Sequence, residues 1–240
     1  MSVDLRVRAT DVQELMDDPQ ADEEMLGRTY QRFGAVNAVV SRPGRLYRQD
    51  IRPRAPARRI RILDIGAGGG DLCRLLVRRL RRDGLEADVT ALDADERAIR
   101  WASAHDAGLG IRYRCALSSE LVEEGDRYDV VLSNHVLHHL DAGEFDAVLR
   151  DSQALTAPGG LVSHHDIARG RLAYTAFAGA TWPLSRTLLA GSFIRVDGLR
   201  SIRRSYTARE LAALAPSGWS VRSRLPARLE LRWEAPRAGT

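Results

Sequence analysis

A glycine-rich loop at the end of an apolar strand is the feature that most constrains this chain. The stretch RILDIGAGGGD (61–71) passes from alternating apolar residues into a segment with glycine at four of the five positions 66–70. Glycine adopts tight turns with positive φ and lets a ligand approach the backbone closely. The following stretch, DLCRLLVRRL (71–80), carries its leucines on one helical face. A strand, a glycine loop and a helix in this order predict the ligand-binding start of an α/β sheet.

Strand and helix patterns alternate along the middle of the chain. Apolar runs typical of buried strands occupy residues 59–65, 87–93, 110–117, 127–134 and 161–167. Amphipathic segments lie between them, and one begins with Asp141 and Glu144 at the spacing of a capping box. Parallel strands need crossover connections, so this order predicts a parallel sheet with helices on both faces. Two more strands are expected at 219–225 and 228–233.

The segments outside this alternation are expected to cover the site. Residues 1–55 predict a helical N-terminal cap, joined through the proline-containing linker RPRAPAR (52–58) to a main domain at 56–240. Residues 170–205 are predicted to be a cap insertion over the active site. Ligands of open α/β sheets bind at the carboxyl ends of the strands, so both caps are expected to meet there.

Composition narrows the class of protein further. The 240 residues suit one medium domain, and no apolar run approaches the roughly 18 residues of a membrane span. The N-terminus lacks the apolar region of a secretory signal, and the two cysteines are too few for a disulfide framework, so we expect a cytoplasmic protein. We expect a monomer or homodimer. The net charge of +4 comes from scattered arginines, and aromatics are only 6%, which argues against nucleic-acid binding.

Three kinds of ligand compete for such a glycine loop. A P-loop ends in Gly-Lys-Ser/Thr, and this chain contains no lysine. A nicotinamide dinucleotide site prefers G-x-G-x-x-G, whereas the spacing here is G-x-G-x-G with Asp64 just before it. A carboxylate at that point repels a pyrophosphate and suits a cationic amino group. S-adenosylmethionine has an amino group, a sulfonium and a ribose diol that Asp93, ending the second strand, is placed to bind.

At this point the chain resembles the class I S-adenosylmethionine-dependent methyltransferases. LDIGAGGGD is similar to their first motif, ALDAD to the segment with their ribose-binding acid, YDVVLSNHVLHHL to their fourth-strand motif, and LTAPGGLV to their turn before strand five. The resemblance covers residues 60–167 closely and 200–235 loosely. It implies a Rossmann-like α/β fold with a seven-stranded, mostly parallel sheet, and S-adenosyl-L-methionine as the cofactor.

The resemblance also implies how the cofactor is held. Asp64 and the glycine loop are expected at the methionine end, and Asp93 at the ribose, with Ala94 beside the adenine. Many relatives have an aspartate after strand three, but CALSSEL (115–121) has none there, so backbone groups of Ala116 and Leu117, or the Ser118 hydroxyl, are expected to substitute. The expected cofactor-binding residues are Asp64, Gly66, Ala67, Gly68, Gly70, Asp93, Ala94, Ala116, Leu117 and Asn134.

Two further likenesses concern the methyl acceptor. SNHVLHHL (133–140) resembles the small-molecule C- and O-methyltransferases of quinone biosynthesis, and HHDIARGRLAY (164–174) with SIRRSYTARELAAL (201–214) is similar to a bacterial subgroup associated with polyketides and phenolic lipids. They imply a small-molecule acceptor, with O-methylation of a phenolic or polyketide-type natural product preferred. The alternatives are C-methylation of a quinone-type ring, a non-catalytic S-adenosylmethionine-binding module and a nicotinamide oxidoreductase.

Histidines gather at two predicted strand ends and supply the catalytic candidates. Phenols have a pKa near 10, so a general base is useful, and histidine suits that role. The candidates are His135, His139 and His165. Alternatively, His138 and His139 begin a helix, and strand alternation turns only one of His164 and His165 inward. No metal is expected, because a divalent ion held by these histidines needs clustered carboxylates that we do not find in the sequence.

Aromatic residues of the two caps are the candidates for contact with the acceptor. Tyr30 and Phe33 come from the first cap, and Tyr174 and Trp182 from the second. A planar apolar acceptor stacks on such side chains. The alternative for each of them is packing within the helical layer itself.

Overall fold

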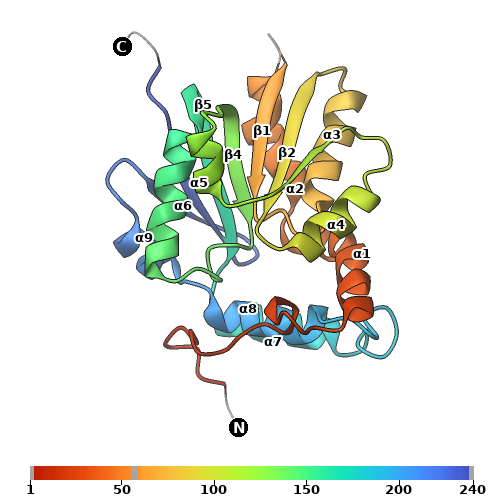
Figure 1. Cartoon of the computed structure of the whole chain (residues 1–240). Helices are drawn as coiled ribbons and strands as arrows, with labels where there is room; N and C mark the ends of the chain where they lie inside the picture. Colours follow the sequence, from red (N-terminus) through yellow and green to blue (C-terminus); the bar gives the residue numbers. More distant parts are fainter. Residues whose placement is uncertain (1–2, 56–58, 238–240) are drawn as a thin grey trace.

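A seven-stranded twisted sheet organises the chain, and a helical layer lies across one end of it (Figure 1). The computed structural model describes residues 3–55 and 59–237. The strands are β1 (Ile60–Ile65), β2 (Ala87–Asp93), β3 (Arg112–Cys115), β4 (Tyr128–Asn134), β5 (Thr156–Ile167), β6 (Ser220–Arg224) and β7 (Arg228–Glu234). Their order is β3-β2-β1-β4-β5-β7-β6; β7 pairs antiparallel with both β5 and β6, and the other described pairs are parallel. The predicted Rossmann-like α/β fold is confirmed.

Helices cover both faces of this sheet, as the alternating pattern predicts. Together with those at the carboxyl ends of the strands, the helices are α1 (Glu23–Val40), α2 (Pro43–Leu46), α3 (Asp71–Arg82), α4 (Glu96–Ala104), α5 (Ser118–Glu123), α6 (Ala142–Ala154), α7 (Arg171–Thr181), α8 (Ile194–Arg204) and α9 (Ala208–Leu214), with short turns η1 (Leu15–Asp17), η2 (Tyr47–Ile51) and η3 (Arg52–Arg54). The capping box at the start of α6 is present, with Glu144 N donating to Asp141 Oδ1 at 2.8 Å.

The core lies on the two faces of the central strands. On one face, Ile62 of β1 and Leu132 of β4 pack with Leu76 of α3, and none of these side chains reaches solvent. On the other face, Leu63 and Val131 pack in a second buried cluster with residues of α5. Strand alternation sends neighbouring side chains to opposite faces, so burial on both faces explains the continuous apolar run of β4.

The second half of the predicted N-terminal cap packs on the sheet. Tyr47 and Ile51 of η2 are buried in the same cluster as β1 and α3. Of the predicted linker, residues 52–54 form η3 and Ala55 is buried, while 56–58 lie outside the described residues. Residues 43–55 therefore cover one face of the sheet.

β5 begins earlier than the predicted strand 161–167. The APGG stretch (157–160), expected to be a turn before the strand, lies within β5 as an irregularity, where the pairing with β4 shifts between Tyr128 and Val130. Gly159 takes a positive φ of 74° there. Residues 157–160 therefore make the pairing between β4 and β5 irregular but do not end β5.

An N-terminal strap, residues 4–20, lies with α7 and α8 across the carboxyl ends of the parallel strands (Figure 1). Buried polar side chains hold it there. Arg169 Nε donates to Leu5 O at 3.0 Å, and the Asp197 carboxylate accepts from the amides of Leu15 and Met16 at 2.7 and 3.0 Å. The strap therefore forms one wall of the cavity at the carboxyl ends of the strands.

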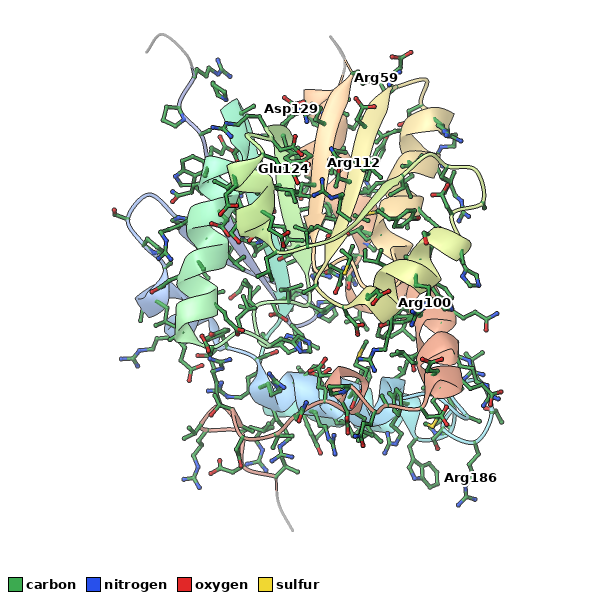
Figure 2. The ribbon with its side chains drawn as sticks, viewed as in Figure 1. Arg59, Arg100, Arg112, Glu124, Asp129 and Arg186 are labelled. Atoms are coloured by element: carbon green, nitrogen blue, oxygen red, sulfur yellow. The ribbon has the colours of Figure 1, made fainter. Side chains whose placement is uncertain are left out.

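The outer surface carries the arginine charge. Arg59, Arg100, Arg112 and Arg186 are exposed and lie on the outside of the molecule (Figure 2). Several of them pair with acids, for example Arg59 Nη1 with Asp88 Oδ1 at 2.9 Å. Across residues 3–55 and 59–237, no helix combines the length and apolar character needed to cross a membrane.

Candidate active site

A cavity of about 470 Å³ opens at the carboxyl ends of β1, β2 and β4, beneath α1, α7, α8 and the strap. The order of the sheet reverses between β1 and β4, and this switch point is where open α/β sheets bind their ligands. Nine of the ten residues expected to bind the cofactor line this cavity. The exception is Gly70, which caps α3 behind the loop.

The glycine loop is shaped by positive φ angles. Gly66 has φ of 68°, and a Cβ there would lie 2.4 Å from Val136 Cγ2. Gly68 has φ of 53°, and a Cβ there would meet no described atom within 4 Å, because the position faces the cavity. Glycine at position 66 therefore allows the loop to pack closely against Val136. Glycine at position 68 leaves the backbone open to contact by a ligand.

Replacing Gly66 by alanine is expected to destabilise the fold, because it combines a positive φ with a collision against Val136. Backbone strain of about 1–3 kcal/mol and overpacking of about 1–3 kcal/mol both apply. Urea unfolding measures the loss. Gly84→Ala is the matched control, since Gly84 has φ of 69° and open space around its Cβ. Equal losses in the two variants would contradict the packing role of Gly66.

Asp64 is a buried carboxyl group with an unused oxygen. Its side chain reaches the cavity wall, and Oδ2 accepts from Cys73 Sγ at 3.3 Å. Oδ1 has no hydrogen-bond partner among the described residues. Burial raises the pKa of Asp64 to about 8, and the charges of Asp71 and Asp93 act in the same direction. Such a group stabilises a cation placed beside it.

Asp93 ends β2 at the opposite side of the loop. Its Oδ2 accepts from Gly68 N at 2.7 Å, and its Oδ1 accepts from Asp95 N at 2.9 Å. A carboxylate has about four acceptor sites, so two remain for a ligand. Burial raises the pKa of Asp93.

The region expected to hold the adenine is built mainly from apolar groups. Ala94, Ala116 and Leu117 line the cavity there. The Ser118 hydroxyl, an expected substitute for the missing aspartate, donates instead to Asp151 Oδ2 at 2.6 Å. The Ala116 amide donates to Asp93 O at 3.2 Å, so neither group is a free donor.

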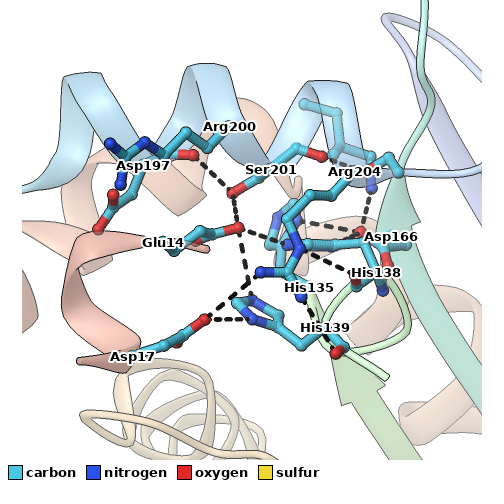
Figure 3. Close-up of polar contacts among 12 residues, drawn as sticks. Glu14, Asp17, His135, His138, His139, Asp166, Asp197, Arg200, Ser201 and Arg204 are labelled. Carbon is cyan, nitrogen blue, oxygen red and sulfur yellow. Dashed lines mark hydrogen bonds and ion pairs between the residues drawn. The ribbon is translucent and has the colours of Figure 1, made fainter. Parts of the chain in front are cut away.

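At the other end of the cavity, His138 lies between two buried carboxylates (Figure 3). Its Nδ1 is 2.7 Å from Asp166 Oδ1, and its Nε2 is 3.2 Å from Glu14 Oε1. Burial opposes the charged imidazolium, but the Asp166 and Glu14 carboxylates raise the pKa of His138 to about 10. Burial likewise opposes ionisation of Glu14, yet His139 and His138 lower the pKa of Glu14 to about 2. Unless a ligand displaces its proton, His138 is therefore charged at neutral pH.

His139 is held by a carboxylate of the strap. Its Nδ1 lies 3.0 Å from Asp17 Oδ2, and its Nε2 lies 3.8 Å from Glu14 Oε1 (Figure 3). The ring lines the cavity and its side chain is 28% exposed, so a molecule in the cavity can reach it. An Asp–His pair of this kind orients the imidazole and fixes its tautomer.

His135 directly follows β4 in a left-handed conformation, with φ of 62°. Such a φ is uncommon for residues other than glycine and concentrates at functional sites. Its Nε2 lies 2.7 Å from Ser41 Oγ, and Asn134 Nδ2 donates to the same oxygen at 3.2 Å. Burial lowers the pKa of His135, so the ring is neutral at pH 7. His135 lines the cavity, with its Nε2 engaged by Ser41.

His164 and His165 do not line this cavity. Both are buried within β5, which has β4 on one side and β7 on the other. His165 Nε2 lies 3.0 Å from Ser163 Oγ, and His164 Nδ1 lies 2.8 Å from Ser133 Oγ. Burial lowers the pKa of both rings. The geometry therefore does not bring His165 to the acceptor, and we do not retain it as a catalytic candidate.

Only two of the four aromatic candidates for contact with the acceptor line the cavity. Tyr30 and Phe33 of α1 line the cavity, but Tyr174 and Trp182 do not. Trp182 is 71% exposed, and Phe177 of α7 takes the place at the cavity wall. Tyr174 lies three residues before Phe177, and Trp182 follows the last residue of α7, so the position along the helix decides which aromatic side chain reaches the wall. The sequence pattern alone did not fix that position.

Sequence reasoning missed the cavity residues of the strap and of α8. Glu14, Asp17, Asp197 and Ser201 all line the cavity. Their local sequence is polar and has no distinctive spacing, so it carried no signal of a site. His138 was set aside as a helix-start residue, but α6 begins only at Ala142 and His138 lies in the preceding turn.

Comparison with known proteins agrees with the fold and the motifs. Residues 39–217 match the family described as "Methyltransferase domain". The chain belongs to this family, and it is a class I S-adenosylmethionine-dependent methyltransferase.

Several relatives with similar sequences are ubiquinone biosynthesis O-methyltransferases. The chain is 42% identical over 120 residues to a ubiquinone biosynthesis O-methyltransferase of Caulobacter sp. (strain K31), covering 48% of this chain and 44% of the relative. It thus spans about half the length of the curated relatives it matches.

Solved structures share the fold at low sequence identity. The plantazolicin methyltransferase BpumL, in complex with a triazolic desmethylPZN analog and SAH, matches with a TM-score of 0.60 at 13% identity, over 93% of each chain. Human N-acetylserotonin methyltransferase in complex with SAM matches with a TM-score of 0.60 at 13% identity, over 90% of this chain and 57% of its own.

Proposed function

We propose that this methyltransferase transfers a methyl group to the oxygen of a neutral phenolic or polyketide-type small molecule. The observation that carries the proposal is one cavity with two chemically different ends. Asp64, the glycine loop and Asp93 line one end, and a histidine face of His135, His138 and His139 lines the other. The similarity to O-methyltransferases of quinone biosynthesis supports the same choice of acceptor atom.

The residues present fit S-adenosylmethionine. The unpartnered Oδ1 of buried Asp64 suits its amino group, the open position at Gly68 suits close backbone contact, and the two free acceptor sites of Asp93 suit its ribose diol. When bound, the cofactor supplies an electrophilic methyl group on a sulfonium. Asn134, the last residue of β4, also lines the cavity, and we assign it to the cofactor.

The charge of the cavity favours a neutral acceptor. Seven carboxyl residues line it, and no arginine is among its described lining, although the chain has 36 basic residues. These carboxyl residues are Glu14, Asp17, Asp64, Asp71, Asp93, Asp95 and Asp197, of which Asp64 is largely protonated in the free protein at pH 7. Two carboxylates a few ångströms apart repel by about 1 kcal/mol even in water and by more in a shielded cavity. An acceptor bearing a carboxylate or phosphate is therefore disfavoured.

The chain's own contribution to the reaction is alignment and activation of the acceptor. Tyr30, Phe33 and Phe177 supply aromatic wall for a planar ring. We assign activation of the acceptor oxygen to His139, because Asp17 fixes its ring while Nε2 faces Glu14 and the cavity. His135 is a contact for the acceptor beside it.

Because the pKa of Asp64 is raised, we expect that binding of the cofactor releases a proton. Its pKa is raised to about 8 in the free protein, so the group is largely protonated at pH 7, and a cationic amino group favours the ionised form. Affinity for S-adenosylmethionine is therefore expected to rise with pH up to about 8. Calorimetry at pH 7 in phosphate and in Tris measures the released proton, and Asp64→Asn is expected to abolish it. Identical binding enthalpies for wild type in the two buffers would contradict the assignment.

The same raised pKa sets a stability trend for the free protein. Between about pH 4 and pH 8 the native carboxyl holds a proton that the unfolded one has lost, so the free energy of unfolding falls as pH rises. Asp64→Asn should remove this dependence and raise the unfolding temperature at pH 8, while weakening cofactor binding.

Acceptor profiling tests the proposed function. The protein is incubated with S-adenosylmethionine and pairs of planar phenols that differ only by a carboxylate, and methylated products are identified by mass spectrometry and NMR. We expect O-methyl products from the neutral member of each pair. Products methylated only on ring carbon would support the C-methyltransferase alternative, and cofactor binding without any product would support the non-catalytic one.

A further inference from the structure

Three donor atoms converge on one point at the histidine end of the cavity. Glu14 Oε1, His138 Nε2 and the His139 ring offer ligand atoms that lie within 4.8 Å of one another. Glu14 Oε1 is 3.2 Å from His138 Nε2 and 3.8 Å from His139 Nε2. Ligands bound at about 2 Å in a tetrahedral site lie a little over 3 Å apart, so a small contraction would bring this set to coordinating distance.

The opposite nitrogen of each histidine is held by a carboxylate. Asp166 Oδ1 lies 2.7 Å from His138 Nδ1, and Asp17 Oδ2 lies 3.0 Å from His139 Nδ1 (Figure 3). The Ser201 hydroxyl donates to Glu14 Oε1 at 2.8 Å. Carboxylates in this outer position orient histidine ligands in metal sites and raise their basicity. Both imidazoles are thus fixed with Nε2 turned toward Glu14.

His138 Nε2 lacks a hydrogen bond in this arrangement. The side chain is 1% exposed, and Nε2 lies 3.2 Å from Glu14 Oε1 as an ion pair but makes no hydrogen bond among the described residues. A buried polar atom without a hydrogen bond needs an explanation such as an ion. The seven carboxyl residues of the cavity, with no arginine in its described lining, make this space attractive to cations.

We propose that Glu14, His138 and His139 bind a divalent transition-metal cation of the Zn²⁺ class, with a coordination position open to the cavity. Two imidazoles and one carboxylate are a donor set that suits zinc and related ions, and three protein ligands leave a fourth position free. Coordination requires that both Nε2 atoms carry no proton, and a proton held there leaves to solvent on binding. The expectation of no metal rested on the lack of clustered carboxylates in the sequence; Glu14 and Asp17 come from the strap, more than 120 residues away.

A role for the open coordination position in binding the methyl acceptor rests on the proposed function. A phenolic oxygen bound there is polarised by the ion, so its proton leaves to water near neutral pH and its electron pair becomes available to the methyl carbon. His139 then activates the acceptor as a ligand of the ion. The binding of metal itself requires no methyl transfer and is tested separately.

Metal binding is measured on the full chain after chelator treatment and dialysis. Calorimetry with Zn²⁺ alone is expected to show one equivalent bound, and Co²⁺ alone is expected to give visible absorption bands of a tetrahedral nitrogen and oxygen site without a thiolate band. His139→Ala should lower Zn²⁺ affinity by more than about 10-fold, and Asp17→Asn by about 10- to 100-fold. Both positions are partly exposed, so these variants are expected to fold.

His105→Ala is the matched control, because His105 is exposed, stacks on Trp101 and lies outside the cavity. Its Zn²⁺ affinity should equal that of the wild type. No binding of Zn²⁺ or Co²⁺, or equal affinity in His139→Ala and wild type, would overturn the metal site. Methyl transfer that depends on His139 in a chain that binds no metal would leave the proposed function standing and this inference refuted. Metal binding without any methylated acceptor would refute the proposed function alone.

Discussion

Replacing Asp93 by alanine is expected to weaken binding of S-adenosylmethionine by about 100-fold or more. The substitution removes the two acceptor sites that remain for the ribose diol, and hydrogen bonds to a charged group contribute about 1.5–3 kcal/mol each. It also removes the partner of Gly68 N, at 2.7 Å, so the loop that faces the cofactor loses an anchor. Calorimetric titration with S-adenosylmethionine and with its demethylated product measures the loss.

Two further variants separate lost binding from lost folding. Asp88→Ala removes a carboxylate from the same strand, but Asp88 is exposed and paired with Arg59, so cofactor affinity should not change. Asp93→Asn keeps an amide oxygen that can accept from Gly68 N while losing the charge, and should bind with intermediate affinity. An Asp93→Ala protein that folds and binds as tightly as wild type would refute the ribose assignment.

Replacing His139 by alanine is expected to lower kcat by about 100- to 10,000-fold, the usual range for losing assisted proton removal. The cofactor end of the cavity is untouched, so affinity for S-adenosylmethionine should stay within about 2-fold of wild type. The measurement is initial rate at saturating cofactor, with whichever neutral phenol gives turnover. His105→Ala provides the control for loss of an imidazole elsewhere.

Variants of two residues near His139 are expected to change the kinetic constants differently. Asp17→Asn leaves the His139 ring in place but removes the carboxylate at 3.0 Å from Nδ1, so a smaller loss of kcat is expected. His135→Ala should mainly raise KM, because His135 is assigned to contact with the acceptor. A His139→Ala enzyme with wild-type kcat would show that this residue does not activate the acceptor.

The fold could be predicted because its signals are local. The alternation of β1 to β5 with crossover helices, the capping box of α6, and the glycine loop each depend on a few adjacent residues. Asp64 and Asp93 followed from the same logic, because a residue at the end of a parallel strand must lie at the carboxyl edge of the sheet. Local geometry and topology together placed both at the cavity.

The candidates that do not line the cavity have a different cause in common. His165 was a candidate because one strand face was expected to meet the site, but β5 is buried on both faces and neither neighbouring histidine lines the cavity. Tyr174 and Trp182 were chosen by residue type, while the way α7 packs over the cavity brings Phe177 to the wall instead. In both cases side-chain direction depends on packing partners that the sequence pattern does not specify.

The sequence by itself determined the class of fold, the glycine loop and the two carboxylates beside it. The reason is that neighbouring residues set both the backbone conformation at glycine and the place where a parallel strand ends. Only the tertiary structure decided the histidine end of the cavity. There, Glu14 and Asp17 from the strap meet His138 and His139, and Asp17 bonds a residue 122 positions away. Long-range contacts of that kind arise from packing of the strap against α8 and leave no periodicity in the chain.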